Sequence, residues 1–188
     1  MRISAQKWFS SWTIQSAAAR GLKVLKDLGL GVKDKFGNLI AVDDPRLDPV
    51  WEESGKLGIP VAIHTSDPEA FFKPADNRNE SYEELMHNPT WSFYGPQFPN
   101  KETLLAERNH LFEKHPHTTF IALHVANWPE YLDAVSAWLD KYPNMYVEFG
   151  CTRGRTRPSA QARGRVFPEV SGSHTLWNRQ RSRGKDAS

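Results

Sequence analysis

The stretch "IPVAIHTSDPEAFF", residues 59–72, decides the fold. It begins as a short apolar run, which predicts a buried strand, and it then becomes polar. His64 stands at the end of the run, and Asp67 follows closely. The simpler interpretation is a hydrogen-bonded core histidine beside a turn-forming aspartate. The more specific one is a catalytic metal site at the carboxyl end of a barrel strand.

A second apolar run, "TTFIALH" (residues 118–124), also ends in a histidine, His124. Apolar spacing predicts two more strands, at 21–25 and 145–149. It also predicts three helices, at 47–56, 100–114 and 129–139. This alternation predicts an α/β protein with a parallel sheet, either doubly wound or a (β/α)8 barrel, of which four strands are about half. The polar and aromatic connection from 65 to 99 is longer than an ordinary loop, which favours an active-site loop.

The two histidines form a matched pair. The carboxyl ends of parallel strands meet at one rim of the sheet, so His64 and His124 are expected on the same rim. A single strand-end histidine is more often structural, but a pair on consecutive strands favours function. Neutral imidazole is both a common metal ligand and a good general base. Asp67 is either a partner of His64 or the turn residue before a proline.

Four residues are candidates for substrate binding: Asp67 and three others. Lys23 lies within the first strand, where alternation places it on one face; it either binds a substrate carboxylate inside a barrel or is solvated. Trp91 and Tyr94 lie in the long connection and form either an apolar substrate wall or packing beneath the loop. Glu148, in the last strand, either points into a barrel or marks the end of the regular pattern.

Composition excludes several classes of protein. The chain has 39% hydrophobic and 24% charged residues and a formal net charge of +2, as expected for an ordinary globular protein without nucleic acid or membrane as partner. The single cysteine, Cys151, excludes an internal disulfide framework and a multi-cysteine zinc site. The amino end lacks the apolar core of a secretory signal, which predicts a cytoplasmic location.

Five stretches between residues 21 and 150 resemble amidohydrolase family 2; they are "GLKVLKDLGL", "DPRLDPVWEESGKLGIPVAIHTSDP", "FYGPQFPNKETLLAERN", "HPHTTFIALHVAN" and "YPNMYVEFG". The resemblance implies a partial TIM barrel of the metal-dependent hydrolase type, with irregular ends. It implies that His64 is the fifth-strand metal ligand and that His124 is the sixth-strand histidine, the general base or a neighbour of the metal. It also implies a divalent metal, zinc or alternatively manganese, and a small substrate such as a carboxylic acid, lactone or amide.

The sequence departs from the family in its other ligands. The family's His-x-His pair on the first strand and its Asp after the eighth strand have no counterpart here, and "HPH" at 115–117 falls in a predicted loop. Weak metal binding is therefore expected. Hydrolysis of a C–O or C–N bond is the first hypothesis, nonoxidative decarboxylation the second and a non-catalytic fragment the third, with a homo-oligomer left open. Nucleic-acid binding by the arginine-rich tail is the weakest alternative.

Neither end of the chain continues the resemblance to the family. Residues 1–20 are interpreted as a non-native start, and residues 151–188 as a disordered tail translated out of frame. With permitted codons, shifting residues 170–179 by one nucleotide gives Tyr-Gln-Asp-Arg-Ile-Leu-Phe-Gly-Thr, and Asp follows. That is the strand ending that the family resemblance leads one to expect.

Overall fold

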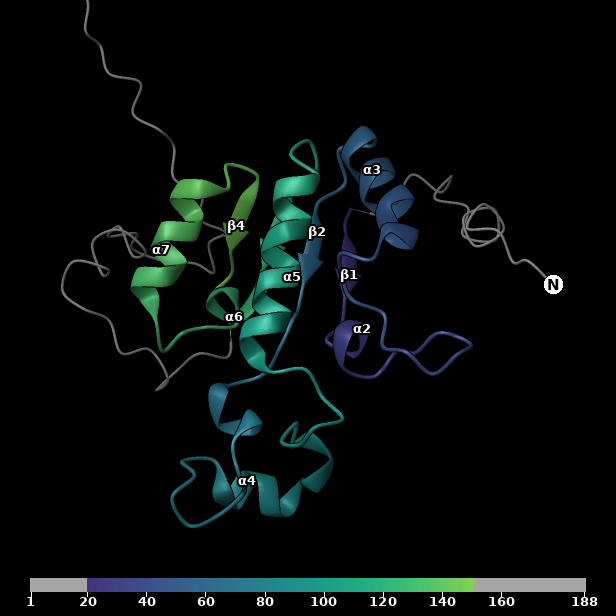
Figure 1. Ribbon diagram of the computed structural model, residues 1–188. Helices are drawn as coiled ribbons and strands as arrows, with labels where there is room; N and C mark the ends of the chain where they lie inside the picture. Colours follow the sequence, from purple (N-terminus) through teal and green to yellow (C-terminus); the bar gives the residue numbers. More distant parts are fainter. Residues whose placement is uncertain (1–19, 151–188) are drawn as a thin grey trace, which may run out of the picture.

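The computed structural model of the protein describes residues 20–150 (Figure 1). The predictions for residues 1–20 and 151–188 therefore lie outside the described residues, apart from Arg20. Within the described part, four short strands form one parallel sheet in the order β1-β2-β3-β4. The strands are β1 (Leu22–Val24), β2 (Val61–Ile63), β3 (Phe120–Ala122) and β4 (Met145–Val147).

Helices join each strand to the next. Between β1 and β2 lie α2 (Asp27–Leu30), η1 (Pro45–Leu47) and α3 (Asp48–Lys56). Between β2 and β3 lie η2 (Glu69–Phe72), α4 (Tyr82–His87), η3 (Pro89–Trp91) and α5 (Lys101–Lys114). Between β3 and β4 lie α6 (Leu123–Ala126) and α7 (Leu132–Lys141).

The strand order distinguishes the two predicted architectures. In a doubly wound sheet the order reverses at a switch point, whereas in a (β/α)8 barrel each strand pairs with the next one along the chain. The order seen here has no reversal. The predicted fold class, an α/β partial barrel, is confirmed.

The core lies between the sheet and the three longest helices. The register pairs Val61 with Phe120 and Phe120 with Met145, so the buried side chains form rows across one face of the sheet. These side chains pack against Trp51 of α3 and Phe112 of α5 in one cluster. Figure 1 shows α5 in front of β2, with α3 and α7 to either side. The middle residues of β2, β3 and β4 point to the other face of the sheet and are only partly buried. In the described part of the chain, helices thus cover one face of the sheet more fully than the other.

The connection predicted as one long loop has a fold of its own. Its short helices η2, α4 and η3 form a lobe, residues 65–99, beyond the carboxyl ends of the strands (Figure 1). Ala70, Phe71 and Leu85 are buried together in this lobe, with Phe72 and Phe93 against them. This cluster is separate from the main core.

Of two helix starts predicted from single residues, one agrees with the structure and one differs. Asn100 caps α5 as predicted, since its side chain accepts a hydrogen bond from the backbone N–H of Thr103 at 2.7 Å. The prediction that Pro129 lies in the first turn of a helix is wrong, because α7 begins only at Leu132. The chain leaves β3 through left-handed residues at 124–127, and the helix begins only after them.

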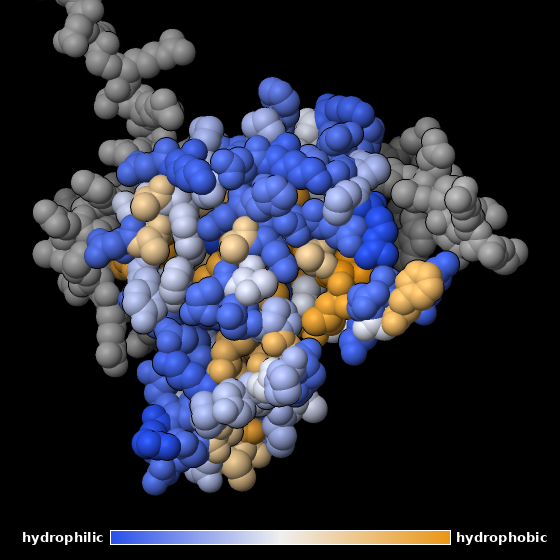
Figure 2. Space-filling model, in the orientation of Figure 1, coloured by the Kyte–Doolittle hydropathy of each residue, from blue (hydrophilic) through white to orange (hydrophobic). Residues whose placement is uncertain are grey.

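Among the described residues, exposed apolar side chains lie near α2 and also in the 65–99 lobe, where Met86 and Tyr94 are each 56% exposed. Figure 2 shows hydrophilic side chains over most of the visible face and hydrophobic ones gathered around α2 and the loop after it. Val32 and Phe36, in that loop, are 41% and 75% exposed. Across residues 20–150, no helix combines the length and the apolar character needed to cross a bilayer.

Candidate active site at the carboxyl ends of the strands

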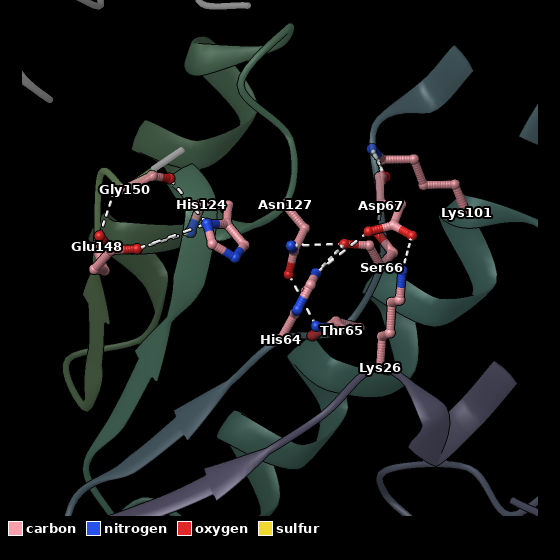
Figure 3. A network of polar contacts seen from close by, with 10 residues as sticks. All are labelled: Lys26, His64, Thr65, Ser66, Asp67, Lys101, His124, Asn127, Glu148 and Gly150. Carbon is pink, nitrogen blue, oxygen red and sulfur yellow. Dashed lines mark hydrogen bonds and ion pairs between the residues drawn. The ribbon is translucent and has the colours of Figure 1, made fainter. Parts of the chain in front are cut away.

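The paired histidines meet at the rim of the sheet. His64 follows β2 directly, and His124 follows β3 by one residue. Their ring centroids are 4.7 Å apart and their planes are inclined by 79°, an edge-to-face contact (Figure 3). The structure therefore brings together the two histidines that the sequence predicts on one rim.

The hydrogen bonds of His64 determine which nitrogen carries its proton. Its Nε2 atom lies 3.1 Å from the carbonyl oxygen of Ser66 and 3.5 Å from Oδ1 of Asp67. Both oxygens are acceptors, so a neutral His64 ring carries its proton on Nε2. The lone pair is then on Nδ1.

Asp67 links three elements at this rim. Its carboxylate forms an ion pair with Nζ of Lys26, after β1, and faces His64 (Figure 3). Its backbone carbonyl accepts a hydrogen bond of 2.7 Å from Nζ of Lys101, at the start of α5. Burial would raise the pKa of Asp67, but the hydrogen bonds from His64 and Lys26 outweigh burial and hold that pKa below its ordinary value. Asp67 is therefore ionised at neutral pH.

His124 has the opposite tautomer. Its Nδ1 atom lies 2.8 Å from the carbonyl oxygen of Gly150, and 3.8 Å from Oε2 of Glu148. Because a carbonyl only accepts, the neutral ring carries its proton on Nδ1 and keeps a lone pair on Nε2. The backbone N–H of His124 donates to Oε2 of Glu148 at 3.3 Å. The carboxylate of Glu148 thus contacts both the backbone and the ring of His124.

His124 lies in a strained backbone turn. Four consecutive residues, 124–127, have φ between 53° and 55°, the left-handed region that L-residues avoid at a cost of about 1–2 kcal/mol each. Val125 is the most unusual of them because its side chain is β-branched and fully buried. Asn127 is the residue type best suited to this region after glycine.

Asn127 connects this turn to the end of β2. Its Oδ1 accepts a hydrogen bond from the backbone N–H of Thr65 at 2.9 Å, and its Nδ2 donates to the carbonyl of Ser66 at 2.7 Å (Figure 3). Ser66 presents that same carbonyl to His64. The left-handed turn therefore orients His124 directly and His64 through Asn127 and Ser66.

A pocket of about 290 Å³ opens beside these residues. One wall is aromatic, formed by Phe71 and Trp91 with stacked rings whose centroids are 6.3 Å apart. The ammonium of Lys26 lines the pocket, paired with the carboxylate of Asp67 and 5.2 Å from the ring centroid of Phe93. The lining residues are Lys26, His64, Ser66, Asp67, Pro68, Phe71, Glu84, Trp91, His124, Asn127 and Pro129.

Four of the six residues predicted for the site line this pocket, namely His64, His124, Asp67 and Trp91. Lys23 and Tyr94 do not. Lys23 is the middle residue of β1, and its side chain is exposed. Partial burial lowers its pKa, and the charge of Glu148 opposes that shift. Tyr94 is 56% exposed. The pocket takes Lys26 instead of Lys23, because residues beyond the strand end face the rim.

The sequence reasoning missed Asn127 and Lys101. Asn127 lies three residues after His124 in the sequence. This spacing does not predict its hydrogen bonds to the segment after β2, because they depend on the left-handed turn. Lys101 resembles a solvent-facing residue at a helix start, yet its side chain is 1% exposed. Burial lowers the pKa of Lys101 to about 8, while the charge of Glu130 opposes that shift.

The described residues do not fit a zinc-type site. Structural and catalytic zinc sites use three or four protein ligands. Within residues 20–150, no group of three or more His, Cys, Asp or Glu side chains is arranged to hold a metal ion. The two imidazoles leave only Nδ1 of His64 and Nε2 of His124 as lone-pair donors, while Asp67 is engaged by Lys26. The role of His64 as a metal ligand therefore stays a prediction.

Comparison with known proteins identifies the family. The sequence matches the profile described as Amidohydrolase over residues 13–177, so the chain belongs to the amidohydrolase family. This range extends beyond residues 21–150 at both ends. Members of the superfamily are typically metal-dependent enzymes. A comparison with curated protein sequences gave no significant match.

Several solved structures are similar to this chain. One is an uncharacterized TIM-barrel protein from Bordetella bronchiseptica, at 21% identity and a TM-score of 0.36, covering 58% of this chain and 28% of the other. Another is 2,6-dihydroxybenzoate decarboxylase from Rhizobium, at 20% identity and a TM-score of 0.45, covering 78% of this chain and 48% of the other. The same values hold for a 2,6-dihydroxybenzoate decarboxylase complexed with 2,6-dihydroxybenzoate. The chain thus spans less than half the length of these proteins.

Proposed function

We propose that this chain supplies the acid–base part of a hydrolase site for C–O or C–N bonds, with His124 as the general base. The observation that carries the proposal is the contact between Nδ1 of His124 and the carbonyl of Gly150. It leaves the Nε2 lone pair of a pocket-lining imidazole available for a proton.

The reaction follows from that lone pair. Nε2 of His124 removes a proton from water as the water oxygen attacks the carbonyl carbon of an ester, lactone or amide. The C–O or C–N bond then breaks, and the imidazolium returns the proton to the leaving oxygen or nitrogen. Lys26 uses one of its three N–H donors for Asp67 and offers the others to a carboxylate elsewhere on the substrate. The wall of Phe71 and Trp91 binds the apolar part of the substrate. Zinc or manganese is proposed for the whole protein on the strength of the family, with any ligands beyond His64 coming from outside residues 20–150.

A second candidate is nonoxidative decarboxylation, favoured by the stacked Phe71 and Trp91 beside the Lys26 ammonium. These groups suit an aromatic carboxylate. In that reaction the bond between the carboxyl group and the ring breaks, CO2 leaves, and an imidazolium gives its proton to the ring carbon. The two reactions are distinguished by their products, since only the second releases CO2.

The test compares His124→Asn with the wild-type chain. Asparagine tolerates the left-handed backbone and keeps an N–H donor near the position of Nδ1, but it has no base. We incubate the full chain with carboxylate-bearing esters, lactones and amides, and with aromatic carboxylic acids, each with and without Zn²⁺ or Mn²⁺. Products and CO2 are measured by mass spectrometry.

We expect His124→Asn to lower turnover by about 10²–10⁴-fold, the usual contribution of a general base. The control is His110→Asn, on the exposed side of α5, where the ring contacts Asp43 at 2.7 Å; it should leave turnover unchanged. Equal turnover in wild type and His124→Asn would reject the role of His124. Absence of turnover with every substrate and metal would favour the non-catalytic fragment.

A further inference from the structure

Arg108 stands out among the residues that surround the candidate site without touching the pocket. It lies on α5, and its side chain is completely buried. Neighbouring positions on the same face of the helix hold leucines, Leu104 and Leu111, which are also buried. Removing a guanidinium from water costs several kcal/mol, and an apolar side chain fills such a position at lower cost. The charged group therefore needs a reason other than filling the core.

The contacts of Arg108 lead to the strained turn. Nη1 donates a hydrogen bond of 2.5 Å to the carbonyl oxygen of Ala126, the third of the four left-handed residues. Nε and Nη2 donate to the side chain of Asn109 at 3.3 and 2.9 Å. The guanidinium also lies 4.8 Å from the ring centroid of Trp138. Burial lowers the pKa of Arg108 to about 9, so the group is charged at neutral pH.

The turn is held from three sides. Backbone groups that follow β2 form hydrogen bonds with the side chain of Asn127. Directly after β4, the backbone carbonyl of Glu148 accepts a hydrogen bond from the N–H of Val125 at 2.7 Å, and the carboxylate of Glu148 accepts one from the N–H of His124. From α5, Arg108 binds the carbonyl of Ala126. Strained backbone persists only where its surroundings fix it. A charge-assisted hydrogen bond is among the stronger single contacts available for this.

We infer that Arg108 is a positioning residue, which holds the left-handed turn at Ala126 and thereby sets the orientation and tautomer of the His124 ring. The inference rests on the proposed function only where it says that the ring of His124 is positioned for catalysis. The geometric claim concerns the ring of His124 and can be tested without a substrate.

The experiment observes the ring nitrogens of the histidines by ¹⁵N NMR in the full chain. His124→Asn identifies the signals of His124 by their loss. In wild type we expect Nδ1 of His124 to be protonated and Nε2 to be unprotonated. In Arg108→Met, which removes the donor and keeps the length of the side chain, we expect the signals of His124 to show a mixture of both tautomers.

His115 is an internal control in the same spectra. It is 6% exposed and its Nε2 lies 3.1 Å from Oδ1 of Asp48, at the opposite end of α5 from the pocket. Its signals should be unchanged in Arg108→Met. Arg108→Lys, which retains a charged donor, should restore most of the wild-type pattern of His124. Arg78→Met, at an exposed arginine of the lobe, should have no effect.

Three results would overturn the inference: an unchanged His124 in Arg108→Met, an equal change in His115, or a lysine variant that behaves like methionine. The first shows that other contacts hold the turn, the second that Arg108 supports the whole fold, and the third that the donor is not what matters. Lack of turnover in the substrate panel would count against the proposed function alone.

Discussion

Ser66 and Gly150 each present a backbone carbonyl to one of the paired histidines, and the two carbonyls contact different ring nitrogens. His64 is bonded through Nε2 and His124 through Nδ1. Two identical side chains on neighbouring strands thus expose different lone pairs. Only the second exposes Nε2 at the pocket, which is why the proposed base is His124.

Glu107 offers a pH test of the fold at a single residue. Burial, with a smaller contribution from the charge of Asp43, raises its pKa from 4.5 to about 7. A raised pKa in the folded state means that the folded protein binds the proton more tightly than the unfolded chain. The protonated carboxyl therefore contributes stability below pH 4.5, and this stability is lost as the pH rises from 4.5 through about 7.

Glu107→Gln should therefore stabilise the protein at pH 8 relative to wild type and have little effect at pH 4.5. We expect about 1–2 kcal/mol at pH 8, less than the full pKa shift would give, because water screens the half-buried carboxyl. Denaturant unfolding at both pH values measures the difference. Glu52→Gln, on the exposed face of α3, is the matched control. A Glu107→Gln effect of equal size at both pH values would contradict the assignment.

Helix α5 is the element that connects the core, the lobe and the site. Its first residue, Lys101, binds the carbonyl of Asp67, and Arg108 binds the carbonyl of Ala126 two turns later. One helix thus contacts the backbone beyond the ends of both β2 and β3. A shift of α5 along its axis would disturb both histidines together.

The cap of this helix is testable on its own. Asn100→Ala removes the side-chain acceptor that binds the N–H of Thr103, and we expect it to cost about 1 kcal/mol of unfolding free energy. Asn100→Asp keeps the acceptor and should be close to wild type. Chemical denaturation gives both values. A loss of the same size in both variants would show that the side-chain acceptor is not what stabilises the start of α5.

The molecule as a whole consists of a large core and a small one. The sheet and the helices α3, α5 and α7 share the large core, whereas the 65–99 lobe has only a few buried apolar residues. A segment with so little buried apolar surface opens at lower free energy than the sheet. The aromatic wall of the pocket belongs to this lobe, so its opening would expose the site.

Leu85→Ala should open the lobe without unfolding the sheet. Leu85 is 2% exposed, and truncating a buried leucine costs about 2–5 kcal/mol. In hydrogen exchange we expect faster exchange at the amides of Leu85 and Trp91, which bond within the lobe, and little change at Phe120 in β3. Leu111→Ala, in the large core, should instead accelerate exchange in both regions. Equal acceleration at Phe120 and Trp91 in Leu85→Ala would show that the lobe is not a separate unit.

Much of the fold could be predicted from local pattern. Apolar runs and helical spacing located the four strands and the main helices, and Asn100 marked the start of α5. The long connection was predicted to be an active-site loop, which stays a prediction. Its helices were not predicted, because they are short and carry few apolar residues. Pro129 was misplaced because nothing in the chain around it signals four left-handed residues.

The sequence by itself determined the parallel α/β sheet and the meeting of His64 and His124, because strands that end in histidine must place it on the rim where parallel strands end. Only the tertiary structure decided the tautomer of each ring, the choice of Lys26 over Lys23, and the roles of Asn127, Lys101 and Arg108. These depend on contacts between residues far apart in the chain. A backbone carbonyl carries no signal in the sequence, and which side chain reaches it is settled only when the helices pack on the sheet.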